Sequence, residues 1–246
     1  MILRPVSSSA EDHNKGQLDA QNLKITKIAK QQKRPDRYSI YIDEKYSFSL
    51  SEYQLAGAKL FIGKQFTQGE LTSFIDESAF GKAYERALNY VMIRPRSKQE
   101  IQDYLKRTFL YPKPKNYVDK AGVRQLVKRE VDKEKVESMI ERVMARLDEK
   151  GYINDMAFAR AWVNSRQLTK KSSKRKLEQE LRAKFIDQEI IATVLQNQND
   201  TEVGNLKEVI IKKRRLSKYQ DDVKLTQYLL RQGFNYDDIK EQIEYV

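Results

Sequence analysis

Lysine and arginine recur in three clusters along this sequence. Of all its residues, these are the most clearly suited to a function, which is to bind an anionic partner. The clusters lie beside three residues that can begin helices, Ser97, Ser173 and Asp221. They comprise Arg94, Arg96 and Lys98 in the first, Lys170, Lys171, Lys174, Arg175 and Lys176 in the second, and Lys212, Lys213, Arg214, Arg215 and Lys218 in the third. Arg166, shortly before the second cluster, is a further candidate for contact with the same partner. With 47 basic against 35 acidic residues, the chain carries a net charge of +12, which favours polyanionic partners.

An ordinary structural explanation competes with binding for each cluster. Lysine and arginine are favourable near the carboxyl ends of helices, where they offset the helix dipole, and surplus cations keep a surface soluble. A single cluster would be explained in this way. Three clusters at equivalent positions of a repeat favour a basic stripe along one surface, which suits a phosphate backbone or the acidic face of a filament.

Residues that commonly carry catalysis are scarce. His13 is the only histidine and lies in a polar N-terminal stretch, and the absence of cysteine excludes disulfides, thiolate nucleophiles and cysteine metal sites. The stretch 63–67 has the wrong spacing for a phosphate-binding loop. Acidic pairs at 221–222 and 237–238 fall at expected helix starts, where capping is a better explanation than magnesium binding. We therefore predict no enzyme, no cofactor and no metal site.

The stretch from Gly151 to Leu181 is the clearest element that could position a basic cluster. Gly151 can end one helix, and Asn154 or Asp155 can accept the amide hydrogens at the start of the next. The helix that follows has one apolar face at helical spacing, formed by Phe158, Ala159, Trp162 and Val163. We expect a core helix of a small helical unit here.

This helical unit recurs. The segment Leu177–Ile190 aligns with Leu225–Ile239 at an offset of 48 residues if one residue is inserted, and Ile101–Arg107 is a fainter third copy. The longer separation of the first two copies predicts an insertion near 110–132. A repeat of this length is typical of stacked helical modules.

Capping residues predict where the helices begin. Ser97, Ser173 and Asp221 each lie four residues before an equivalent apolar residue of the repeat, and all three types accept amide hydrogen bonds. Capping boxes are expected at Thr67–Glu70 and at Ser97–Glu100.

These elements predict a mainly α fold, with three tandem three-helix, helix-turn-helix-like repeats in an elongated array behind a small three-stranded antiparallel sheet. The strands fall between Leu23 and Leu50, with a hairpin around Asp43–Lys45. Within the insertion, Val123, Leu126 and Val127 predict a short helix after two prolines. The expected domains are a disordered tail at 1–21, an N-terminal domain of sheet and helix at 22–78, and repeats at 79–151, 152–199 and 200–246.

Aromatic residues fit packing better than base stacking. Five of them lie at core spacing: Tyr84, Phe158, Trp162, Phe185 and Phe234. The roles of Tyr90, Tyr104 and Tyr228 stay open between the core and a surface that stacks nucleic-acid bases.

Hydropathy bears on the compartment of the protein. Mean hydropathy is −0.77, no apolar run is long enough to cross a bilayer, and the first residues lack the apolar centre of a secretory signal. We expect a cytoplasmic protein without membrane contact.

Three separate segments resemble the RecX family of recombinase regulators. The first is Ile153–Arg166 with the following Lys-Leu-Glu-Gln-Glu-Leu, the second is Arg86–Ser97 with Glu100, Ile101 and Leu105, and the third is Leu229–Phe234 with Ile239. The residues that carry this resemblance structurally are Gly151, Asp155, Phe158, Ala159, Leu177, Leu181, Gly233 and Phe234. The insertion at 110–132 departs from the family pattern, whereas many Gram-positive members have a similar N-terminal sheet.

The resemblance implies a non-enzymatic regulator in DNA repair, recombination and the SOS response. Its partner would be the RecA recombinase filament on single-stranded DNA, with the modules lying along the filament groove. Binding would alter assembly, ATP turnover, strand exchange and coprotease activity, usually by inhibition. DNA would be contacted directly or through the filament, and we expect the regulator itself to be a monomer.

The main alternative is a helix-turn-helix protein that binds a particular DNA duplex, usually as a dimer. Against it, the segment 187–196, which would be the recognition helix, is acidic or apolar and has no lysine or arginine to meet bases. An enzyme of another kind would depend on a metal or substrate, for which the sequence offers few ligands.

Overall fold

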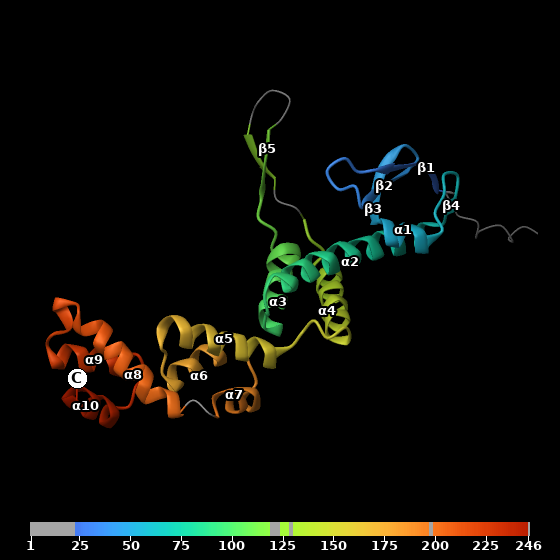
Figure 1. Ribbon diagram of the computed structural model, residues 1–246. Helices are drawn as coiled ribbons and strands as arrows, with labels where there is room; N and C mark the ends of the chain where they lie inside the picture. The colour runs from blue at the N-terminus through green and yellow to red at the C-terminus, as the bar shows by residue number, and fades with distance from the viewer. Residues whose placement is uncertain (1–22, 119–123, 128–129, 197–198, 246) are drawn as a thin grey trace, which may run out of the picture. The chain divides into compact units, whose positions relative to one another are not determined.

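The computed structural model describes residues 23–118, 124–127, 130–196 and 199–245. The expected disordered tail at 1–21, with His13, lies outside the described residues. The chain forms two compact units that divide between Lys82 and Ala83. The first is built on a sheet and the second is mainly helical (Figure 1).

A small antiparallel sheet organises the first unit. Its strands are β1 (Leu23–Lys30), β2 (Arg37–Ile42), β3 (Lys45–Ser51) and β4 (Gln65–Phe66), in the order β3-β2-β1-β4. The predicted hairpin is confirmed, because Asp43 and Glu44 have positive φ angles of 47° and 66° and link β2 to β3 in a two-residue turn. The prediction of three strands missed the fourth, which pairs Phe66 with Leu23.

The core of this unit lies under the sheet. It is formed by the buried side chains Ile25, Ile40, Ile42, Phe48, Leu50, Phe66 and Leu71. Helix α1 (Glu52–Ala58) begins with a reciprocal capping box between Ser51 and Gln54. Partly buried side chains of α1 pack on the core, which gives the short sheet the helical cover it needs.

Helix α2 (Gln68–Ile93) is one continuous helix of 26 residues. Its predicted capping box is confirmed, since the Thr67 amide donates to Glu70 Oε2 at 2.8 Å and the Glu70 amide donates to Thr67 Oγ1 at 3.3 Å. The helix therefore runs without interruption across the expected boundary at 78/79, and the division between the two units falls within it.

The second unit contains three modules of three helices each. The first module consists of the end of α2 with α3 (Lys98–Leu105) and α4 (Lys133–Glu149). The second consists of α5 (Asp155–Lys170), α6 (Lys174–Arg182) and α7 (Gln188–Leu195), and the third of α8 (Asn199–Arg214), α9 (Asp222–Arg231) and α10 (Tyr236–Tyr245). A short 3₁₀ helix, η2 (Ser217–Tyr219), precedes α9.

Equivalent residues of the repeat form equivalent cores. Leu177 and Leu181 of α6 are fully buried, and so are Leu225 and Leu229 of α9. The same holds for the third, fainter copy, since the buried residues of α3 are Ile101 and Leu105. The predicted period is thus confirmed in the packing.

The alignment of the last two modules needs no inserted residue. Ile186 and Phe234 are both buried, as are Ile191 and Ile239, and each pair is separated by 48 positions. Phe185 therefore corresponds to Gly233, not to Phe234. Its predicted core position is wrong, because its side chain is 74% exposed.

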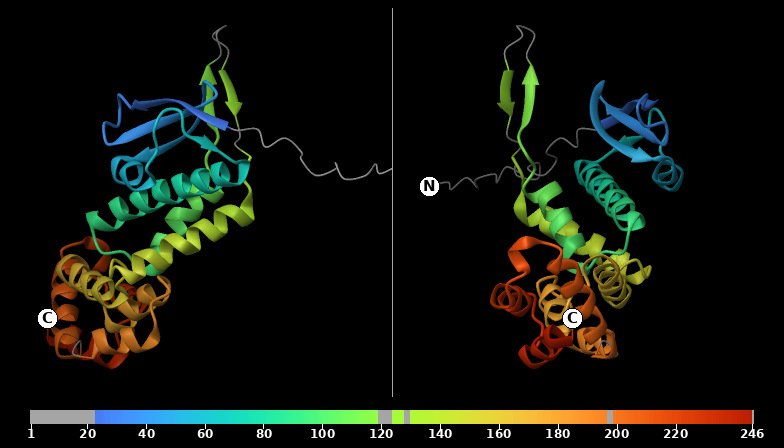
Figure 2. Two further views of the ribbon diagram at one scale, coloured as in Figure 1. Left: turned by 90° about the vertical axis from the view of Figure 1, so that its right-hand side faces the viewer. Right: turned by 60° about the vertical axis from the view of Figure 1, so that its left-hand side comes forward.

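The insertion forms a β-hairpin instead of the predicted helix. After α3 the chain makes a π-helix, η1 (Lys106–Leu110), and then strands β5 (Lys115–Val118) and β6 (Arg124–Val127) pair antiparallel (Figure 2). Two prolines oppose a helix at its start, and the valines and tyrosine that follow favour an extended backbone. Val123 lies outside the described residues.

Candidate partner-binding surface

The three predicted helix caps are confirmed and fix the turn between the first and second helices of each module. Ser97 Oγ accepts from the Glu100 amide at 3.1 Å, and Ser173 Oγ accepts from the Lys176 amide at 3.2 Å. Asp221 Oδ1 accepts from two amides, those of Val223 at 2.8 Å and Lys224 at 3.2 Å. We call these turns the corners of the modules: residues 92–98, 168–174 and 216–222.

At the first corner, Arg96 has a structural role. Its side chain is only 12% exposed, its guanidinium lies 3.8 Å from the centre of the Tyr90 ring, and its Nε donates to the Tyr90 carbonyl at 3.4 Å. Tyr90 in turn stacks on Tyr104 at 4.2 Å between ring centres. Both tyrosines, whose roles the sequence left open, therefore pack within the first module. Lys98, the third cation of this cluster, is exposed.

Glu100 joins the first corner to the second module. Half of its predicted capping box forms, because its amide is capped by Ser97, but its carboxylate pairs with Arg94 Nη1 at 3.1 Å and Lys184 Nζ at 2.9 Å. Burial alone would raise the pKa of Glu100, but hydrogen bonds from Lys184 and Arg94 outweigh it and hold the pKa below its usual value. The charge of Arg94 is thus partly used within the protein.

Arg166 also serves packing. Its Nε donates to Glu180 Oε2 at 2.6 Å, and its guanidinium lies 4.4 Å from the centre of the Trp162 ring. The indole nitrogen of Trp162 donates to the same Glu180 oxygen at 2.9 Å. This network joins α5 to α6, so Arg166 is not part of an open basic surface.

Some of the cations of the second and third clusters meet at one groove. The cavity has a volume of about 480 Å³ and lies between the second and third modules. Five predicted lysines line it: Lys170, Lys171, Lys176, Lys212 and Lys213. The only acidic residue in its lining is Glu208, which pairs with Lys171 Nζ at 3.1 Å. We call this the lysine groove.

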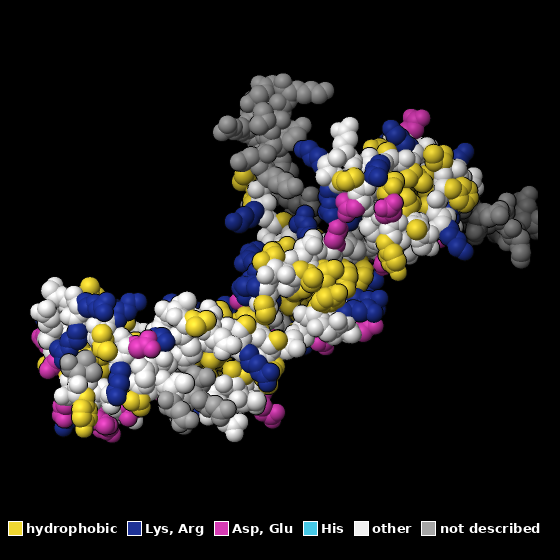
Figure 3. Space-filling view, in the orientation of Figure 1, with side chains coloured by type: hydrophobic (Ala, Val, Ile, Leu, Met, Phe, Trp, Pro, Cys, Tyr) yellow, Lys and Arg dark blue, Asp and Glu magenta, His cyan; other side chains and the backbone are white. Residues whose placement is uncertain are grey.

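Other residues of the third cluster have separate surroundings. Arg214 pairs with Asp222 Oδ1 at 2.5 Å and donates to the Gln220 carbonyl at 2.9 Å, so it holds the third corner together. Lys213 lies 4.5 Å from the ring centre of Tyr228, which also lines the lysine groove. Arg215 and Lys218 are exposed, as is Arg175 in the second cluster. Figure 3 shows basic side chains gathered over α8 and α9 on this face.

The modules are joined by a contact that repeats. The Lys98 amide, at the start of α3, donates to Asp155 Oδ1 of the second module at 2.8 Å. The Lys174 amide, at the start of α6, donates to Glu202 Oε1 of the third module at 3.1 Å. Asn154 caps α5 through the Ala157 amide at 2.8 Å, which leaves Asp155 available for this junction.

Gly233 is placed at the second of these junctions. Its φ is +89°, and a Cβ atom there would lie 2.7 Å from Ser173 Oγ. That hydroxyl also donates to the Gln232 carbonyl at 2.7 Å. The sequence marked Asp155 as a possible helix cap and Gly233 by resemblance, but it gave no sign of their neighbours across the junctions, which are the Lys98 amide and Ser173.

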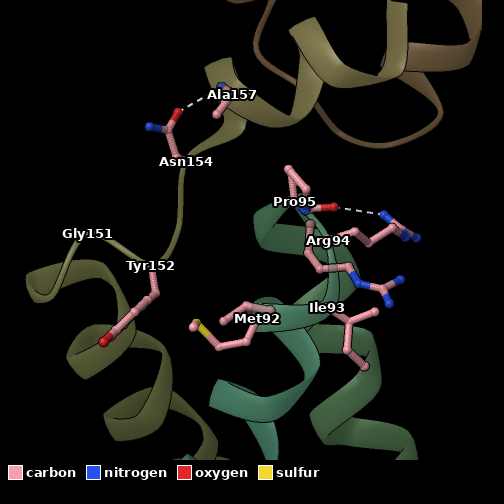
Figure 4. A pocket seen from close by; sticks show the side chains of 10 residues that line it. Met92, Ile93, Arg94, Pro95, Gly151, Tyr152, Asn154 and Ala157 are labelled. Atoms are coloured by element: carbon pink, nitrogen blue, oxygen red, sulfur yellow. Dashed lines mark hydrogen bonds between the residues drawn. The ribbon is translucent and has the colours of Figure 1, made fainter. Parts of the chain in front are cut away.

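Sequence reasoning missed a second groove, at the first corner. Its volume is about 390 Å³, and it lies between the end of α2 and the connection from α4 to α5. Met92 and Ile93 line it with 69% and 77% of their surfaces exposed, and Figure 4 shows Met92 extending toward Tyr152. Gly151, which also lines it, has the positive φ of 71° expected for the end of α4.

Two features are absent from the described residues, a membrane-spanning helix and a metal site. Among them, no helix is long and apolar enough to cross a bilayer. In the same residues, no group of three or more histidine or acidic side chains is arranged to hold a metal ion.

Two family profiles match the chain. The profile described as "RecX, second three-helix domain" matches residues 154–195, which hold the second module. The profile described as "Regulatory protein RecX N-terminal domain" matches residues 23–67, which hold the sheet of the first unit.

Similar proteins extend this match over most of the chain. The regulatory proteins RecX of Listeria welshimeri and Bacillus subtilis are each 29% identical to it, over 89% and 90% of this chain and 74% and 77% of theirs. RecX of Listeria monocytogenes is 32% identical over 72% of this chain and 57% of its own length. A solved structure titled "Crystal structure of regulatory protein RecX" superposes with a TM-score of 0.62 at 23% identity, covering 90% of this chain and 99% of that one. The chain therefore belongs to the RecX family and is a non-enzymatic regulatory protein.

Proposed function

We propose that this protein binds the RecA recombinase filament on single-stranded DNA and inhibits its ATPase, strand-exchange and coprotease activities. Membership of the RecX family supports the partner. The observation that carries the mode of binding is the lysine groove, where cations from two sequence clusters meet at the junction of two modules. We also propose that the protein acts in the cytoplasm as a monomer.

The physical basis is the addition of several weak contacts. Each module presents a corner, so modules joined in series can contact neighbouring subunits of a filament together, and each contact raises the effective concentration of the next. Excess positive charge steers the protein toward a polyanionic surface and makes binding weaker at high salt. The protein should therefore bind an assembled filament much more tightly than an isolated recombinase subunit.

Specific recognition of duplex DNA is less well supported. Helix α7 would be the recognition helix of the second module, yet it contains no lysine or arginine, and its residues Ile191 and Leu195 are buried in the core. A side chain that reads base edges must be polar and must reach the groove. The second module therefore lacks the surface that this alternative requires.

The test is recombinase ATPase activity on single-stranded DNA, titrated with this protein. We expect inhibition at fewer than one molecule of this protein per recombinase subunit, because each molecule spans several subunits. Unchanged ATPase and strand-exchange rates, together with tight binding to a duplex in the absence of recombinase, would refute the proposal and favour the alternative.

A further inference from the structure

Each corner carries the same pair of residues, one apolar and one basic. The apolar residue lies five positions before the helix cap, and the basic residue lies three positions before it. The pairs are Met92 with Arg94, Leu168 with Lys170, and Leu216 with Lys218. We call Met92, Leu168 and Leu216 the apolar anchors.

All three apolar anchors are exposed. Met92, Leu168 and Leu216 have 69%, 81% and 51% of their surfaces accessible to solvent. A single exposed leucine on a protein surface needs no explanation. Exposure of a large apolar side chain at the same position of three modules, each time beside a cation, is a repeated feature and indicates a contact surface.

The cores of the modules do not use the anchors. In α5, the buried side chains are Phe158, Ala159 and Val163, whereas Leu168 lies in the last turn, outside the core. Met92 occupies the equivalent last turn of α2, and Leu216 follows the end of α8. Removing an anchor would therefore leave the packing of its module unchanged.

Two of the anchors also line grooves between modules. Met92 lines the groove of about 390 Å³ at the first corner, where it extends toward Tyr152 (Figure 4). Leu168 lines the lysine groove of about 480 Å³ at the second corner. In both grooves an exposed apolar side chain lies next to cations, so the complementary surface would be apolar and bordered by negative charge.

We propose that the three corners dock onto a repeating protein surface, each apolar anchor filling an apolar recess bordered by carboxylates that pair with the neighbouring cation. This inference rests on the proposed function, in which the partner is a filament of identical subunits. It assigns the contact to the protein face of that filament and not to its nucleic acid. A phosphate backbone offers no apolar recess, and exposed bases are usually bound by aromatic side chains rather than by leucine or methionine.

The test uses the full chain with all three anchors replaced: Met92→Ser, Leu168→Ser and Leu216→Ser. We expect its affinity for the RecA filament to fall at least about tenfold, because three apolar side chains would no longer be buried against the partner. The loss should persist at high salt, since apolar contacts are not screened. Its affinity for single-stranded DNA without recombinase should be unchanged.

A matched control replaces three other exposed apolar residues, Ile62→Ser, Ile211→Ser and Leu230→Ser, which are 64%, 47% and 43% exposed. This control variant should bind the filament like the wild type. Circular dichroism and urea unfolding should be the same for all three proteins, because none of the six side chains is buried.

The outcomes separate this inference from the proposed function. If the wild-type protein does not bind the filament, both fail. If the wild type binds and the anchor variant binds equally well, only the anchor inference is refuted. If the anchor variant loses affinity for single-stranded DNA alone, the anchors contact nucleic acid and the assignment to a protein surface is wrong.

Discussion

The carboxylate of Asp155 accepts a hydrogen bond from the backbone amide of Lys98 at 2.8 Å, across a separation of 57 residues. This bond ties the first helix of the second module to the start of the second helix of the first. Glu202 and Lys174 repeat it at 3.1 Å between the second and third modules. The stacking of modules is thus fixed by side-chain caps that come from the next module.

Replacing Asp155 by alanine should loosen this junction. We expect Asp155→Ala to lower the free energy of unfolding by about 1 kcal/mol, the usual cost of losing a helix cap. Urea unfolding would measure it, and hydrogen exchange should show faster exchange at the Lys98 amide. Asp155→Asn keeps an acceptor oxygen and should lose less.

Glu134→Ala is the matched control, because Glu134 lies in the first turn of α4 and is exposed. This variant measures how much stability is lost when an acidic residue is removed from a helix start that takes no part in a contact between modules. Unchanged protection of the Lys98 amide in Asp155→Ala would contradict the role assigned to this contact.

Gly233→Ala should destabilise the second junction. The residue has φ +89°, and a left-handed conformation costs a non-glycine residue about 1–2 kcal/mol. The added Cβ would also press on Ser173 Oγ, which would lie 2.7 Å away. Gly204→Ala is the control, because nothing lies within 4 Å of a Cβ added at that residue. Gly204 is inside helix α8, where alanine is favoured over glycine by about 1 kcal/mol. Equal unfolding midpoints for the two variants would exclude this account.

The ion pairs of Glu100 should make stability depend on pH. Its folded pKa lies below the ordinary value of 4.5, so the carboxylate contributes stability above that value and loses it as the pH falls through the folded pKa. Glu100→Gln should therefore be less stable than the wild type at neutral pH, and the difference should shrink as the solution becomes more acidic. Urea unfolding at a series of pH values would measure this. The control is Glu141→Gln, at an exposed residue of α4. A difference in unfolding free energy between Glu100→Gln and the wild type that stays constant with pH would exclude the prediction.

Charge changes in the lysine groove should alter binding in both directions. Lys170→Glu with Lys212→Glu should weaken filament binding and reduce the slope of affinity against salt, because fewer counterions are released. Glu208→Gln should strengthen binding, because it removes the only acidic residue of the groove lining.

The matched control is Lys207→Glu with Lys240→Glu, which changes the net charge equally at exposed residues outside the groove. Filament binding at several salt concentrations measures all three variants. A similar loss in the control would mean that net charge, and not the groove, determines affinity.

Local rules predicted much of the helical fold. A cap is satisfied by amides within three residues, so Ser97, Ser173 and Asp221 were correctly identified from their types and spacing. The buried leucines of α6 and α9 were predictable because helical spacing puts residues four positions apart on the same face. The two-residue strand β4 depends on pairing with the distant strand β1, so a local pattern did not reveal it. The hairpin of the insertion was missed because a short apolar run fits a helix or a strand equally well.

The candidate surface was only partly predictable. Sequence clustering placed Arg96, Arg166 and Arg214 beside the exposed lysines, but their planar guanidiniums form contacts within and between helices. Which cation is held inside and which is exposed depends on three-dimensional neighbours, such as Tyr90 or Glu180. The exposed positions of Met92 and Leu168 were invisible for the same reason, because an apolar residue in a helix is ordinarily expected to face the core.

The residue that opens the second helix differs among the modules. It is Lys98 in α3 and Lys174 in α6, and each of these backbone amides receives an acidic side chain from the following module. In α9 the same place is taken by Asp222, whose carboxylate is held by Arg214 at 2.5 Å. The starts of α3 and α6 therefore each donate to a carboxylate of the following module, whereas the start of α9 has a carboxylate of its own that is paired within the third module, so the three modules are not interchangeable in the stack.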